Sequence, residues 1–134
     1  MKRAKQSGFT LVEVLTVIAI IALLAALILG LAGNAQKSAA RNKATAEIEQ
    51  LSTFITDYQM KYGQVPTTNT ALAAALVEAK HSLTNAENPT WMPEDPWGSN
   101  YNYQASSKAT FYLWSTGGST NDNRAMYIGN PKPD

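Results

Sequence analysis

Residues 8–13 read Gly-Phe-Thr-Leu-Val-Glu, and they open an apolar run that continues to Gly33. From Val14 to Gly33 the chain has no charged residue and one mildly polar side chain, that of Thr16. A helix needs roughly 20 apolar residues to cross a bilayer, and this run meets that length. The sequence therefore predicts a membrane-spanning helix near the N-terminus.

The residues before the run predict the orientation of this helix. They carry Lys2, Arg3 and Lys5 and no acidic residue. Short basic flanks stay on the cytoplasmic side of a membrane. We therefore expect a cytoplasmic N-terminus, with the rest of the chain on the opposite side.

Glu13 is an acidic residue at the edge of the apolar run, where an unpaired charge costs on the order of 3 kcal/mol. On a helix it lies one turn from Phe9. If the chain were cut between Gly8 and Phe9, the new α-amine would be a cation within reach of the Glu13 carboxylate. A carboxylate in the first turn also suits the helix dipole. The alternative is a glutamate that only extends to the lipid headgroups.

Together these residues resemble the type IV prepilin signature, in which a short basic leader and a glycine precede phenylalanine and a hydrophobic run. Glu13 occupies the fifth position of the mature chain in this pattern. The resemblance implies cleavage after Gly8 by a prepilin peptidase and N-methylation of Phe9. It also implies assembly, with Glu13 of an arriving subunit pairing with the Phe9 amine of its neighbour.

The composition limits the classes of function. At 134 residues, the chain has room for one small domain besides the anchor. Its net charge of +1 gives no sign of a clustered basic surface, so no nucleic-acid partner is expected. The chain has no cysteine, so packing or a metal ion must hold the loops of an extracytoplasmic domain. This also argues against adhesive type IV pilins, many of which close a C-terminal loop with a cysteine pair.

A second helical pattern follows the apolar run and continues the same helix. Apolar residues recur every three or four positions and predict a helix that ends at Gly63. One half of this long helix would lie in the membrane and the other would lay its apolar face on the domain. The expected buried residues are Ile48, Leu51, Ile55, Tyr58 and Tyr62.

A turn through Pro66 separates this helix from a shorter one, expected over Ala71–Lys80. Thr68, Asn69 or Thr70 can cap its N-terminus. Its expected buried side consists of Leu72, Leu76 and Val77.

Asp95-Pro96-Trp97-Gly98 has the residue order of a type I turn, with Asp first, Pro second and Gly fourth. Tyr101 and Tyr103 alternate behind it, and residues 109–114 are rich in β-formers, which predicts two antiparallel strands. A last short strand is expected over Ala125–Ile128.

The expected fold is therefore α+β and pilin-like, with a long N-terminal helix packed on a small antiparallel β-sheet. We divide the chain into a cleaved basic leader (1–8), a transmembrane helix half that serves as the assembly segment (9–33) and an extracytoplasmic domain (34–134).

The resemblance tightens in the second half of the chain. Residues 61–68 with the alanine- and leucine-rich helix after them look like the corresponding turn of major pseudopilins of type II secretion systems. The segment Asp95-Pro96-Trp97-Gly98, with Tyr101 and Tyr103 behind it, is similar to their Asp-Pro-Trp-Gly-x-x-Tyr-x-Tyr motif. The resemblance implies a subunit of a pseudopilus that is held in the bacterial inner membrane, with a periplasmic domain, before it polymerises. The implied partners are copies of itself, the prepilin peptidase, an inner-membrane assembly platform and minor pseudopilins.

In that family the loop after the last long strand commonly binds calcium, which takes six to eight oxygen ligands. Here the loop contains a single carboxylate. The sequence leaves open a weak structural calcium site or a loop closed by side-chain hydrogen bonds. The candidate ligands are Ser115, Ser119, Asn121, Asp122 and Asn123.

No arrangement of residues indicates an enzyme, because the acids of the domain are dispersed and its one histidine, His81, is expected at the surface. Two alternatives to a secretion filament remain. One is a minor or type IV-like pilin for adhesion, motility or DNA uptake. The other is a membrane-anchored binding domain that does not polymerise.

Overall fold

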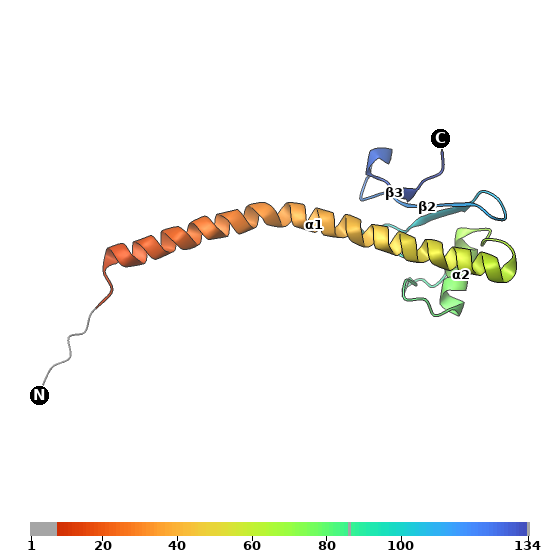
Figure 1. The fold of residues 1–134 in the computed structure, drawn as a ribbon, viewed down its shortest axis with the longest axis horizontal. Coiled ribbons are helices and arrows are strands. Elements are labelled where there is room, and N and C mark those ends of the chain that lie inside the picture. Colours follow the sequence, from red (N-terminus) through yellow and green to blue (C-terminus); the bar gives the residue numbers. More distant parts are fainter. Residues whose placement is uncertain (1–7, 86, 134) are drawn as a thin grey trace, which may run out of the picture. The chain divides into compact units, whose positions relative to one another are not determined.

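The computed structural model describes residues 8–85 and 87–133 (Figure 1). The leader proposed for residues 1–8 therefore lies outside the described residues, apart from Gly8. The fold is the expected α+β combination of a long N-terminal helix and a small antiparallel sheet. Its elements are α1 (Leu11–Tyr62), α2 (Asn69–Glu78), β1 (Asn102–Ala105), β2 (Phe111–Ser115), the 3-10 helix η1 (Arg124–Met126) and β3 (Ile128–Asn130).

Helix α1 continues without a break through Gly30 and Gly33. It ends where the sequence predicts, because Gly63 adopts a left-handed φ of 76° and its N–H donates to the Gln59 carbonyl at 2.8 Å. The chain divides into two compact units, one up to Lys37 and one from Ser38 onward, which we call the head domain.

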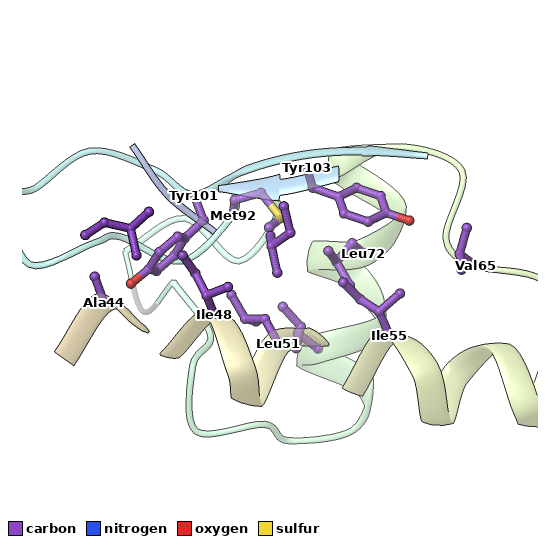
Figure 2. Close-up of a cluster of buried hydrophobic side chains, with 12 residues drawn as sticks. Ala44, Ile48, Leu51, Ile55, Val65, Leu72, Met92, Tyr101 and Tyr103 are labelled. Carbon is purple, nitrogen blue, oxygen red and sulfur yellow. The ribbon is translucent and has the colours of Figure 1, made fainter. Parts of the chain in front are cut away.

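The core of the head domain lies between the second half of α1, α2 and the sheet. Figure 2 shows the side chains of α1 on one side of this core and those of Tyr101 and Tyr103 on the other. Ala44 extends the buried stripe of α1 one turn before Ile48. The main members of the core are Ala44, Ile48, Leu51, Ile55, Val65, Leu72, Leu76, Met92, Tyr101, Tyr103, Leu113 and Ile128.

The three strands form one antiparallel sheet in the order β1-β2-β3. Leu113 in the middle strand faces Tyr103 on one side and Asn130 on the other. The last short strand is present, but its expected bounds, Ala125–Ile128, are wrong, since Arg124–Met126 form η1 and β3 runs from Ile128 to Asn130. The Asn123 side chain caps η1 by accepting a backbone N–H, so this segment makes a local turn instead of pairing with β2.

Of the residues expected in the core, two are exposed and Tyr58 is only half-buried. Tyr62 is 50% exposed because it lies in the last turn of α1, beyond the core residues. Its ring contacts that of Tyr58, with 4.4 Å between the ring centroids. Val77 is 40% exposed because it follows Leu76 by one position and so points about 100° away from the buried face of α2. Helix α2 also begins at Asn69, earlier than expected, with Thr68 as its N-cap.

Two buried tyrosines, one just before β1 and one within it, form hydrogen bonds with residues far away in the sequence. The Tyr101 hydroxyl donates to Glu47 Oε2 of α1 at 2.6 Å, and the Tyr103 hydroxyl donates to the Pro66 carbonyl at 2.5 Å. Burial raises the pKa of both phenols, with the nearby Glu47 carboxylate as a second cause for Tyr101. The pKa of Tyr103 rises to about 12.

These pKa shifts predict a loss of stability at alkaline pH. A phenol with an ordinary pKa of 10.0 when unfolded and about 12 when folded stabilises the fold fully below pH 10, and this contribution is lost as the pH rises toward 12. We expect the unfolding temperature of the full chain in detergent to fall over this range. In Tyr103→Phe the fall should be shallower, while a slope equal to that of the wild type would contradict the assignment. Circular dichroism at each pH measures both.

Candidate functional site

The N-terminus of α1 holds its acidic residue in a capping box. The Thr10 N–H donates to Glu13 Oε2 at 2.8 Å, and the Thr10 hydroxyl donates to the same oxygen at 2.9 Å. In return, the Glu13 N–H donates to Thr10 Oγ1 at 3.2 Å. Reciprocal bonds of this kind satisfy N–H groups that a helix start leaves without partners. The carboxylate is thus fixed at the helix start, with Oε1 outside these bonds.

Thr10 is the site residue that the sequence reasoning missed. A threonine followed three positions later by glutamate, just before an apolar run, is the usual signature of a capping box. The residues Thr10 and Glu13 have this spacing. The signature predicts that α1 begins directly after Thr10, as the structure shows.

The first part of α1 presents apolar side chains on all its faces. Phe9 is 89% exposed, and every large apolar side chain described between Leu11 and Leu29 is more than half exposed. The hydroxyl of Thr16 donates to the Val12 carbonyl of its own helix at 2.8 Å. By length and composition this helix can cross a membrane. An apolar surface of this extent requires lipid or neighbouring helices to cover it.

A second polar centre lies inside the head domain at Asp95, which is 5% exposed. Its Oδ1 accepts the N–H groups of Trp97 at 3.0 Å and Ser99 at 2.9 Å. Its backbone carbonyl accepts the Gly98 N–H at 3.0 Å, which closes the four-residue turn from Asp95 to Gly98 that contains Pro96. Its Oδ2 accepts the buried Ser115 hydroxyl at 2.5 Å. One carboxylate therefore joins the turn to the end of β2.

The candidate calcium ligands after β2 already bond to each other and to the loop. Ser119 Oγ accepts the Asn123 N–H at 3.0 Å, and Asp122 Oδ1 accepts the Tyr127 hydroxyl. Asn123 Oδ1 caps η1, and Asn121 is exposed. Ser115 is drawn away from this group, because its hydroxyl donates to Asp95. The set has one carboxylate, and the side-chain oxygens of Ser115, Ser119, Asp122 and Asn123 already accept or donate hydrogen bonds, so it does not fit a calcium ion that needs six to eight oxygen ligands.

His81 lies just after α2, near a helix end as expected, but it is half-buried and not fully exposed. Its Nδ1 accepts the Leu83 N–H at 3.1 Å, and its ring packs edge-on against Phe54 with 5.3 Å between centroids. Among residues 8–85 and 87–133, no group of three or more His, Cys, Asp or Glu side chains is placed to hold a metal ion.

Comparison with known proteins agrees with this arrangement. Residues 32–127 match the family model of type II secretion system protein G, and residues 3–29 match the prokaryotic N-terminal methylation motif. The type II secretion system core protein G of Pseudomonas aeruginosa is 31% identical, over 91% of this chain and 94% of its own length. The proteins of the same name from Vibrio cholerae and Escherichia coli are 32% and 39% identical, covering 87% and 72% of this chain and 83% and 70% of their own lengths.

Together, the two family matches cover both compact units of the chain. The methylation motif covers the capping box and the exposed apolar helix, and the protein G model covers the head domain with its Asp95 turn. The chain therefore belongs to the protein G family of type II secretion systems, the pseudopilins that carry a prepilin N-terminus.

Proposed function

We propose that this chain is a structural, non-catalytic subunit that polymerises into a pseudopilus through its N-terminal helices. It would insert into the inner membrane with its N-terminus in the cytoplasm and the head domain in the periplasm, and a prepilin peptidase would cleave it after Gly8 and methylate Phe9. The observation that carries this proposal is the exposed apolar part of α1, which has a single acidic residue fixed at its start.

Cleavage creates the partner of this carboxylate. Before cleavage, the nitrogen of Phe9 belongs to the peptide bond with Gly8 and carries no charge. Afterwards it is an amine cation at the end of an apolar helix, where an unpaired charge is costly. Pairing this amine with Glu13 of a neighbouring copy would satisfy both charges and fix the stagger between helices. A buried pair of this kind specifies register more than it adds stability.

The Thr10 capping box keeps Glu13 satisfied until such a partner arrives. The two Thr10 bonds both end on Oε2, so Oε1 can accept an amine without first breaking the box. Thr10 is accordingly a positioning residue for the glutamate. The assembly platform and minor pseudopilins would then start and extend the filament by adding subunits from the membrane.

Thr10→Val should reduce filament yield several-fold at equal subunit level. Loss of a capping side chain costs a helix start about 1 kcal/mol, and the free carboxylate then samples other rotamers. Thr10→Ser keeps the hydroxyl and should restore the yield. Quantifying sheared filaments against the membrane pool measures the effect. Equal yields for the valine and serine variants would contradict a positioning role.

Deleting the gene in its host distinguishes secretion from other uses of the same architecture. We expect proteins to accumulate in the periplasm instead of the medium, with motility, adhesion and DNA uptake unchanged. Loss of motility or DNA uptake with normal export would instead indicate a type IV-like pilin. Absence of the chain from any sheared filament, with peptidase and platform present, would indicate an anchored domain that does not polymerise.

A further inference from the structure

We propose that the C-terminal loop, residues 116–127, is closed by its own hydrogen bonds and packing, so that the head domain folds without a bound divalent cation. This departs from the calcium site that the family resemblance implies. The inference rests on the fold of the head domain and is independent of the proposed assembly function.

The start of the loop is fixed from the protein interior. Ser115 is fully buried, and its Oγ accepts the Gly117 N–H at 2.9 Å while its hydroxyl donates to Asp95. The Ser115 hydroxyl thus both donates and accepts a hydrogen bond, and these two bonds hold its side chain between Asp95 and the Gly117 backbone. Asp95 likewise uses both carboxylate oxygens within the network. The buried side chains of Ser115 and Asp95 therefore bond to each other and to nearby backbone N–H groups.

Short-range hydrogen bonds hold the middle and the end of the loop. The Asp122 side chain accepts the hydroxyl of Tyr127, the residue just before β3. The Ser119 hydroxyl oxygen accepts the Asn123 N–H and closes the preceding turn, residues 119–123. The Ser119 N–H also donates to the Thr116 carbonyl at 3.1 Å. The single carboxylate of the loop thus accepts the Tyr127 hydroxyl.

Backbone packing fills the space between the two ends of the loop. A methyl group at Gly117 would overlap the Met126 carbonyl oxygen, and one at Gly118 would overlap the Trp97 ring. The same Met126 carbonyl accepts a hydrogen bond from Arg41 of α1 at 3.3 Å. Across the described part of the chain, every buried side-chain nitrogen and oxygen has a hydrogen-bond partner. Among these residues, no buried side-chain oxygen is therefore left without a partner that a cation would have to supply.

Calcium titration of the purified full chain in detergent tests the proposal. A site with a Kd one hundred times below the calcium concentration would raise the unfolding temperature by roughly 10 °C or more. We expect the same unfolding temperature in excess CaCl2 and in excess EGTA. A calcium-dependent rise that EGTA reverses would overturn the proposal.

Trypsin cleavage after Arg124 reports on the loop itself, with cleavage after Lys108 in the β1–β2 turn as an internal reference. Calcium should leave the ratio of the two rates unchanged. Tyr127→Phe removes the hydroxyl that bonds Asp122 and should speed cleavage after Arg124 about fivefold, as expected for one lost hydrogen bond. Tyr112→Phe removes a hydroxyl from β2 and serves as the matched control. Protection of Arg124 by calcium, or equal rates for the two variants, would contradict closure by these side chains.

Discussion

Glu13→Ala should lower filament yield roughly 100-fold while the head domain stays folded. The variant leaves the Phe9 amine of each neighbouring subunit without a counter-charge in an apolar bundle. An unpaired charge in such surroundings costs on the order of 3 kcal/mol, and each 1.4 kcal/mol corresponds to about tenfold in an equilibrium. The head domain should not change, since Glu13 lies in the other compact unit of the chain.

Two control variants separate charge from helix structure. Glu13→Gln keeps an oxygen that can accept the Thr10 bonds but has no negative charge, so it should be nearly as defective as the alanine variant. Thr16→Val removes a hydroxyl whose bond stays within its own helix and should assemble normally. Sheared filament yield and the trypsin resistance of the head domain give the two readouts. Normal assembly of either Glu13 variant would contradict the pairing.

Asp95→Ala should produce the largest loss of head-domain stability among single side-chain truncations at the polar sites. It removes the acceptor of three hydrogen bonds, from Trp97, Ser99 and the buried Ser115 hydroxyl. Breaking a buried, charge-assisted network of this kind costs about 3 kcal/mol or more, which lowers the unfolding temperature by roughly 12 °C or more for a domain of this size.

Two neighbouring variants calibrate this result. Asp95→Asn keeps an oxygen for the turn and an amide that can donate to Ser115, so it should lose less stability than the alanine variant. Glu94→Ala removes an exposed carboxylate next to it and should leave the unfolding temperature unchanged. Thermal unfolding of the three proteins in the same detergent provides the comparison. An Asp95→Ala protein as stable as Glu94→Ala would show that the network does not support the domain.

The features that the sequence predicts well are those set by local chemistry. The apolar run, the stripe from Ile48 to Ile55, the glycine after Tyr62 and the Asp95 turn each depend on residues close together in the chain. The capping box belongs to the same class, because Thr10 and Glu13 are three positions apart.

The features that the sequence does not predict depend on contacts between distant residues. Helical periodicity identifies the side of α1 that is buried, but it does not predict that the rest of the head domain stops contacting α1 before Tyr62. The bond between Asp95 and Ser115 joins residues 20 positions apart through the tertiary fold. The donor types after β2 allowed either a calcium site or closure by hydrogen bonds. Only the geometry shows that Ser119 already bonds the Asn123 backbone and that Asp122 bonds Tyr127.

The intact mass of the chain, extracted from membranes of cells with and without prepilin peptidase, tests the central claim most directly. With the peptidase, we expect a protein that begins at Phe9 and carries one additional methyl group. Without it, the full chain from Met1 should be recovered unmodified. Recovery of the uncleaved chain from cells that contain active peptidase would contradict processing, and with it the pairing of the Phe9 amine with Glu13 on which filament assembly depends.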